Sequence, residues 1–241
     1  GADISRRRAG NLAALNPGPG ERILDLGCGQ GLLTEEIARA VGPSGEVIGV
    51  DPSADMLAGA RSQCADHVHV RILEGGAGAI PLETASLDGA ASLQVLEYVD
   101  DLEAACAELA RVLRPGGRAV IGDMQHETLS RASDDPARMA RMLAAWDRHV
   151  AEPNTPARLP HLLTQAGFQV LEMRPEPFTA YKLRPDSFPF MLMHLMRTYA
   201  VQNDLLSAAD ADAWFAEQEH RAAAGTFFFS LTHFVAIAVR S

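Results

Sequence analysis

Three glycines that follow an apolar run constrain this chain more than any other sequence feature. Residues 23–26 are typical of a buried strand; Gly27, Gly29 and Gly31 follow, and a helix-periodic stretch begins at Leu32. Glycine adopts backbone conformations that other residues avoid and lets a ligand approach the main chain. A strand-to-helix turn of this kind presents backbone N–H groups at the positive end of a helix. The pattern therefore predicts a ligand-binding turn in an α/β fold.

The chemistry of the ligand is indicated by a carboxylate and by the glycine spacing. A second apolar run, at 47–50, ends in Asp51, and a carboxylate there can accept two hydrogen bonds from a ribose. The spacing is G-x-G-x-G, whereas dinucleotide sites have G-x-G-x-x-G, and no P-loop sequence occurs. Asp25 and Glu21 place negative charge near the turn, which suits a cationic sulfonium better than a pyrophosphate. A nicotinamide dehydrogenase is therefore disfavoured.

Four segments resemble, in order and at the expected spacings, the class I S-adenosylmethionine-dependent methyltransferases. They are the Asp-Leu-Gly-Cys-Gly-Gln-Gly motif at 25–31 and the segments 50–57, 86–98 and 109–117. The resemblance covers about residues 20–125 and is closest to the ubiquinone/menaquinone-type, small-molecule branch. It implies S-adenosyl-L-methionine as the cofactor.

The resemblance also implies a set of cofactor contacts. They are Asp25, Gly27, Cys28, Gly29, Gly31, Asp51, Met56, Ala77, Leu93 and Gln94. Met56 begins a helix that would pass the adenine, although a core position is the alternative. The family often has an acidic residue where Gly76 stands, so we expect adenine recognition to rest on the Ala77 backbone N–H and on packing. Leu93 and Gln94 would lie beneath the methionine part of the cofactor, with Gln94 toward the substrate.

Methyl transfer to oxygen or carbon also requires removal of a proton by a base. His126 follows the fifth predicted strand, on the rim where an acceptor would lie, and is our candidate base; a solvated loop histidine is the alternative. His194 and His233 are further candidates. No histidine pair has convincing metal-ligand spacing with a carboxylate, so no metal is predicted.

Strands alternate with helices along the first half of the chain, which predicts right-handed βαβ units and a parallel sheet. The expected fold is α/β, a three-layer Rossmann-like sheet that is mostly parallel. The resemblance implies that the last strand, at about 226–240, is antiparallel and lies beside the fifth. We expect a single domain over 1–241, with a cofactor-binding half at about 1–125. Helical insertions at about 126–155 and 184–225 would form a lid over the substrate.

The second insertion contains a helix that is apolar on every side. Residues 188–199 include Met191 and Met193, and methionine adapts to irregular shapes, which suits the wall of an acceptor pocket. A dimer interface or a local core is the alternative interpretation, and a homodimer is therefore a possible assembly.

Composition narrows the partners. The net charge of −10 disfavours nucleic acid, because phosphate binding needs basic surface and the only basic run is 6–8. Three cysteines and the lack of a signal peptide or long apolar run predict a cytoplasmic protein without a membrane partner.

The sequence thus predicts an enzyme that methylates a hydroxyl or activated carbon of a small, fairly apolar molecule, in secondary metabolism or quinone-like chemistry. The alternative is a protein that binds the same cofactor for a non-methylating reaction or as a sensor.

Overall fold

The computed structural model describes residues 2–241, and its centre is one seven-stranded sheet with the order β3-β2-β1-β4-β5-β7-β6. The strands are β1 (Arg22–Leu26), β2 (Glu46–Asp51), β3 (Val70–Glu74), β4 (Leu87–Leu93), β5 (Leu113–Arg131), β6 (Phe168–Ala180) and β7 (Phe229–Arg240). The strands β1 to β5 pair in parallel, whereas β7 runs antiparallel between β5 and β6. This confirms the predicted Rossmann-like sheet and its antiparallel last strand beside the fifth.

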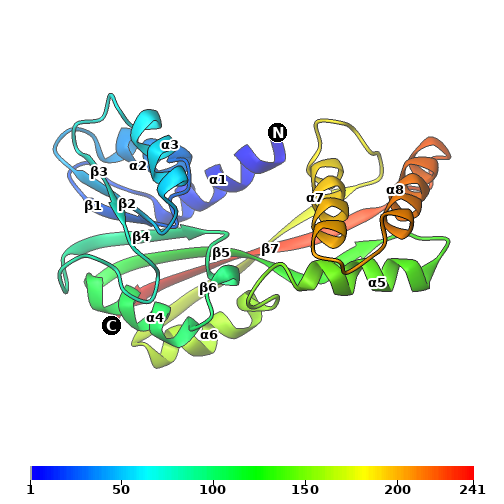
Figure 1. The fold of residues 1–241 in the computed structure, drawn as a ribbon. Helices are drawn as coiled ribbons and strands as arrows, with labels where there is room; N and C mark the ends of the chain where they lie inside the picture. The colour runs from blue at the N-terminus through cyan, green and yellow to red at the C-terminus, as the bar shows by residue number, and fades with distance from the viewer. Residues whose placement is uncertain (1) are drawn as a thin grey trace.

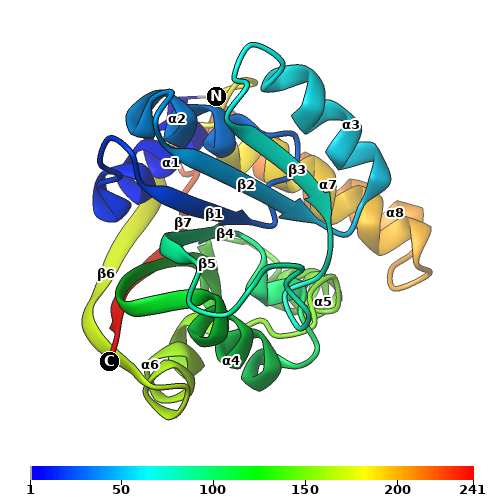
Figure 2. The ribbon, with the colours of Figure 1, turned by 90° about the vertical axis from the view of Figure 1, so that its left-hand side faces the viewer.

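Helices cover both faces of the sheet and complete the three layers. They are α1 (Ala2–Leu15), α2 (Leu32–Val41), α3 (Ala54–Gln63), α4 (Leu102–Val112), α5 (Pro136–Asp147), α6 (Thr155–Gln165), α7 (Phe188–Gln202) and α8 (Ala208–Ala223), with a short 3₁₀ helix η1 (Leu96–Tyr98). The helices α1, α2 and α3 lie on one face, and α4 and α6 on the other (Figure 2). None of the described helices is both long enough and apolar enough to span a bilayer.

Local sequence signals fix the helix ends around the ligand-binding edge. The Ser53 hydroxyl accepts a hydrogen bond from the Met56 N–H at the start of α3, and the Asp101 carboxylate accepts one from the Ala104 N–H at the start of α4. Each cap satisfies an N–H group that the helix itself leaves unpaired. The apolar stripe of α4 packs in the core beneath β4 and β5.

The strands β5, β6 and β7 continue past the other strands and carry the inserted helices (Figure 1). The fifth strand was expected to end before His126, but β5 runs to Arg131. Around these extensions α5, α7 and α8 enclose an apolar cluster of their own, which includes Met142, Met193, Trp214 and Phe229. The predicted helical insertions are thus present, beyond the carboxyl ends of the parallel strands.

Candidate functional site

The glycine turn after β1 is closed by its own backbone hydrogen bonds. The Gly27 N–H donates to the Val50 carbonyl (2.7 Å) and the Gly31 N–H to the Cys28 carbonyl (2.9 Å). The Gly29 N–H donates to the carboxylate at the end of β2 (3.0 Å). The expectation that the turn presents free N–H groups is therefore wrong for the three glycines. The N–H groups of Gly27 and Gly29 hold the turn against β2, and that of Gly31 closes the turn itself.

The three glycines differ in what surrounds them, although all have left-handed φ angles of 71°, 52° and 84°. A Cβ atom on Gly27 would lie 2.1 Å from the Val95 side chain, and one on Gly31 would lie 2.9 Å from the Ala60 Cα. A Cβ on Gly29 would meet no described atom within 4 Å. Gly27 and Gly31 therefore permit close packing, whereas Gly29 leaves open the space that a ligand could use.

Asp51 is held rigidly beside that space. Its Oδ2 accepts the Gly29 N–H at 3.0 Å, and its Oδ1 accepts the Ser53 N–H at 2.9 Å. An ionised carboxylate offers about four acceptor positions, so each oxygen can accept a further hydrogen bond. The side chain is therefore oriented in advance for a pair of hydroxyl groups.

The groups beneath the turn include a second carboxyl group, that of Asp25. It accepts a hydrogen bond from the Thr34 hydroxyl (2.6 Å), and burial raises the pKa of Asp25 to about 6. Burial also raises the pKa of the Cys28 thiol, so this small side chain packs as a neutral group. Glu21 lies at the opposite end of β1, where its Oε2 is 2.6 Å from Arg118 Nη2. Of Asp25 and Glu21, only Asp25 therefore lies at the turn, and the expectation for Glu21 was wrong.

The other predicted contact residues lie along the same edge. Met56 occupies the first turn of α3 with 40% of its surface exposed, so the alternative of a core methionine is wrong. For the Ala77 N–H, no hydrogen-bond partner is found in the part of the chain that the structure describes. Gln94 follows Leu93 with φ of +57°, while its N–H donates to the Gly122 carbonyl at 2.7 Å. A left-handed non-glycine residue stores strain, which is common at binding sites. Their contacts with a cofactor stay predictions.

His126 is a buried residue within β5, so the alternative of a solvated loop histidine is wrong. Its Nε2 lies 3.4 Å from Glu97 Oε2, and Nδ1 has no hydrogen-bond partner among residues 2–241. Asp123 lies in the same cluster, where its Oδ1 accepts the Val95 N–H (3.0 Å). Burial, together with the charge of Glu97, raises the pKa of Asp123 well above its usual range.

A second histidine, which the sequence analysis missed, borders this cluster. The His149 ring stacks on Trp146 with centroids 3.6 Å apart and stands edge-on to His126 at 5.1 Å. Burial lowers the pKa of His149 to about 4, so the ring is neutral near pH 7. Tyr98 and Tyr199 stand edge-on to the same ring. The five rings come from four separate segments, and no spacing in the sequence relates those segments to one another.

The two other candidate histidines lie elsewhere. His194 is exposed on α7, where its ring packs against Phe190 and Phe215 at 4.6 and 4.7 Å between centroids. His233 is fully buried in β7, with Nδ1 3.6 Å from Glu176 Oε2, and burial lowers its pKa. His233 therefore lies near Arg7 of α1, whose charge acts on it, whereas His194 belongs to the inserted helices.

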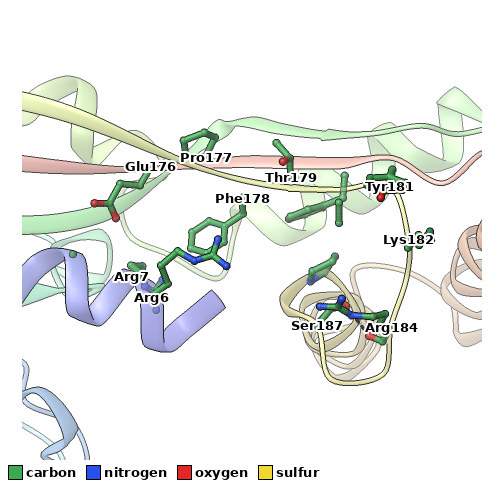
Figure 3. A pocket seen from close by; sticks show the side chains of 14 residues that line it. Arg6, Arg7, Glu176, Pro177, Phe178, Thr179, Tyr181, Lys182, Arg184 and Ser187 are labelled. Carbon is green, nitrogen blue, oxygen red and sulfur yellow. Dashed lines mark hydrogen bonds between the residues drawn. The ribbon is translucent and has the colours of Figure 1, made fainter. Parts of the chain in front are cut away.

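A cavity of about 490 Å³ opens between α1, β6 and the segment that precedes α7 (Figure 3). Its lining combines apolar side chains with positive charge from Arg6, Arg7, Lys182 and Arg184. The sequence analysis had considered the basic run at 6–8 only as a nucleic-acid-binding surface, and had found it too short for that role. Across the described residues, no group of three or more histidine, cysteine or acidic side chains is arranged to hold a metal ion.

Comparison with known proteins relates this architecture to one family. A model described as a methyltransferase domain matches residues 24–121. A 37.1 kDa protein in transposon TN4556 of Streptomyces fradiae is 36% identical over 94% of this chain and 65% of its own length. The 2-phytyl-1,4-naphtoquinone methyltransferase of Thermosynechococcus vestitus is 35% identical over 65% of this chain and 76% of that protein.

Among solved structures, the YcgJ protein of Bacillus subtilis has the same fold, with a TM-score of 0.67 over 98% of each chain at 17% identity. This chain spans about half to two thirds of the length of several curated relatives, at 65%, 56% and 47%. The likeness therefore concerns a shared domain, and the activity has to be argued from the site.

Proposed function

This chain belongs to the class I S-adenosylmethionine-dependent methyltransferases of the small-molecule type, and from that premise we propose its activity. It transfers a methyl group from S-adenosylmethionine to a hydroxyl or an activated carbon of a small, fairly apolar molecule. The observation that carries the proposal is the open space at Gly29 beside the rigidly held carboxylate of Asp51. When bound, the cofactor supplies a methyl group that its sulfonium has already activated.

The residues around the turn fit this cofactor. Asp51 would accept hydrogen bonds from the two ribose hydroxyls, since each of its oxygens keeps an acceptor position. Exposed Met56 would pack on the adenine, and the Ala77 N–H would donate to it. Asp25 would contribute negative charge beneath the turn, which favours a positively charged ligand.

Replacement of Asp51 tests the cofactor assignment. Hydrogen bonds to a charged group contribute about 1.5–3 kcal/mol each, so Asp51→Ala should weaken S-adenosylhomocysteine binding at least about tenfold in isothermal titration. Asp55→Ala is the matched control, because Asp55 is an exposed acid at the start of α3. Unchanged affinity in Asp51→Ala, or binding of NAD in place of S-adenosylhomocysteine, would contradict the assignment.

We further propose His126 as the general base. The Glu97 carboxylate near Nε2 would fix the ring orientation, which leaves the unpaired Nδ1 to accept the proton of the acceptor. The remaining groups of the cluster would exclude water from the acceptor. A neutral His149 cannot repel a protonated His126 by charge, so it does not oppose this role.

Loss of the base should reduce turnover without affecting the cofactor. His126→Gln is expected to lower kcat by about 10²–10⁴, with S-adenosylhomocysteine affinity unchanged. The loss should shrink as the assay pH rises past the pKa of a phenolic acceptor, because an ionised acceptor needs no base. His161→Gln, at an exposed position of α6, is the control.

Wild-type turnover in His126→Gln would show that His126 is not the base. The same substitution would then be tested at His233 and at His194. Tight S-adenosylhomocysteine binding without methylated product, across an acceptor panel, would instead favour the alternative of a non-methylating protein.

The lid and the homodimer are also proposals. The inserted helices lie beyond the carboxyl ends of the parallel strands, which supports a lid over the acceptor. The exposed Met191 and Leu195 of α7 support a homodimer, because large exposed apolar side chains on one helix favour association. Sedimentation velocity distinguishes a monomer from a dimer directly.

A further inference from the structure

The cavity between α1 and β6 is lined by a buried cation, Arg7, whose N–H groups are only partly paired within the described residues. Arg7 is only 7% exposed, and neither Nε nor Nη1 has a hydrogen-bond partner among the residues that the structure describes. Burial lowers the pKa of Arg7 to about 10, so the group remains charged near pH 7. A buried guanidinium normally has its N–H groups paired, because leaving them unpaired is costly. The unpaired groups of Arg7 therefore indicate a ligand that would satisfy them.

The surroundings of Arg7 favour an anion. Lys182, the only lysine in the chain, and Arg184 line the same cavity from the segment before α7 (Figure 3). Glu176 is the one acid among the described lining residues, and it is engaged by Arg174 (3.3 Å) and lies 3.6 Å from His233. A concentration of positive charge in a chain of net charge −10 is difficult to explain by solubility, and it suits a negatively charged ligand.

The cavity also offers apolar surface, and Arg7 in its lining lies near the candidate catalytic cluster. Phe178 lies between β6 and Arg7, with the guanidinium carbon 5.9 Å from the ring centroid, and Tyr181 lines the wall farther along (Figure 3). The charges of Glu97 and Asp123 act on Arg7, so its head group lies near the cluster that contains His126. A ligand here could therefore reach from the basic cavity toward the acceptor site.

We propose that this cavity binds the anionic group of the methyl acceptor, a carboxylate or a phosphate ester attached to an aromatic or similarly apolar body. Arg7 receives the anion through its unpaired N–H groups, since the guanidinium fork matches carboxylate and phosphate oxygens. The apolar body packs on Phe178, and its methylated atom extends toward His126. This inference rests on the proposed methyl transfer and names the class of its acceptor.

Three probes with one aromatic body test the charge preference. Naphthoate, naphthyl phosphate and neutral naphthamide are titrated into the protein by calorimetry in the presence of S-adenosylhomocysteine. At least one anion should bind about tenfold or more tightly than the amide, because a charged hydrogen bond contributes about 1.5–3 kcal/mol. A preference for naphthyl phosphate identifies a phosphorylated acceptor, and a preference for naphthoate identifies a carboxylic acid.

Variants of α1 then locate the preference. In Arg7→Met, anion affinity should fall about tenfold, to the level of the amide, whose own affinity stays within about twofold. Arg7→Lys should retain part of the preference, because it keeps the charge but loses the fork. Arg8→Met is the matched control, since Arg8 is on the same helix but pairs with Glu36 at 2.8 Å.

Thermal melting separates ligand binding from a structural role. Without ligand, the melting temperature of Arg7→Met shows how far Arg7 supports the fold, because the charges of Glu97 and Asp123 act on it. The anionic probe should raise the melting temperature of the wild type and leave that of Arg7→Met unchanged. Equal affinity for all three probes, or an anion preference that survives in Arg7→Met, would overturn the inference.

The outcomes also distinguish this inference from the proposed function. In one outcome, anion binding depends on Arg7, but no hydroxylated naphthoate or naphthyl phosphate is methylated. That outcome would support the anion-binding site and refute methyl transfer to such acceptors. Methylation of neutral acceptors only, at rates equal in the wild type and Arg7→Met, would retain methyl transfer and refute the acidic acceptor.

Discussion

Asp25 places a carboxyl group where ionisation is costly. Burial raises its pKa to about 6, although the Thr34 hydroxyl bond acts in the opposite direction. An aspartate in the unfolded chain titrates near 3.9, so the native state holds the proton more tightly. The contribution of Asp25 to stability is therefore full below about pH 4 and is lost as the pH rises toward 6 and above. Near pH 7 the Asp25 carboxyl group is therefore mostly ionised, and it places negative charge under the glycine turn.

Asp25→Asn should remove that pH dependence. The asparagine still accepts the Thr34 hydrogen bond but does not ionise, so its advantage over the wild type should grow with pH. Between pH 5 and pH 8 the difference in free energy of unfolding should increase by about 1–2 kcal/mol, measured by urea denaturation. Asp55→Asn is the exposed control. A difference that is equal at both pH values would show that ionisation of Asp25 does not lower the free energy of unfolding.

At the scale of the element, α7 presents two different apolar faces. Met193 is fully buried in the cluster that α5, α7 and α8 enclose, whereas Met191 is 40% exposed. The sequence analysis offered both as walls of an acceptor pocket, with a local core as the alternative. For Met193 the local core is confirmed, because its neighbours are side chains of the inserted helices.

The two methionines therefore make a matched pair on one helix. Met193→Ala should lower the free energy of unfolding by about 2–5 kcal/mol, because it removes buried methylenes and leaves a cavity. Met191→Ala should change it by about 0.5 kcal/mol or less. Urea denaturation of both variants measures the contrast. A similar loss in both would mean that the exposed face of α7 is covered in solution, as it would be in a homodimer.

At the scale of the whole molecule, two packed regions share three strands. One region surrounds β1 to β5 with α1, α2, α4 and α6, and the other lies among α5, α7 and α8. The strands β5, β6 and β7 pass through both, and the register between β5 and β7 shifts after Gln125, where the strand leaves the main sheet. The cation-lined cavity borders α1 and this extension, so its shape depends on how the strands hold the two regions.

The sequence by itself determined the parts of this protein that depend on local patterns. Short spacings and residue preferences predict the glycine turn, the place of Asp51 after the second strand, and the order of strands and helices. These patterns identified the family and predicted the nucleoside site, because turn geometry and helix periodicity are encoded within about twenty residues.

Only the tertiary structure decided which distant side chains meet and which are buried. Arg7, Glu97, His126 and His149 come from segments far apart in the chain, and no spacing predicts that they gather at one edge of the sheet. The same holds for Glu21, whose charge is neutralised by Arg118 at the other end of β1. Burial sets the charge state of such groups, and burial is a property of the packed molecule. The partners of the candidate base His126 and the proposed anion cavity therefore became visible only when the strands were assembled.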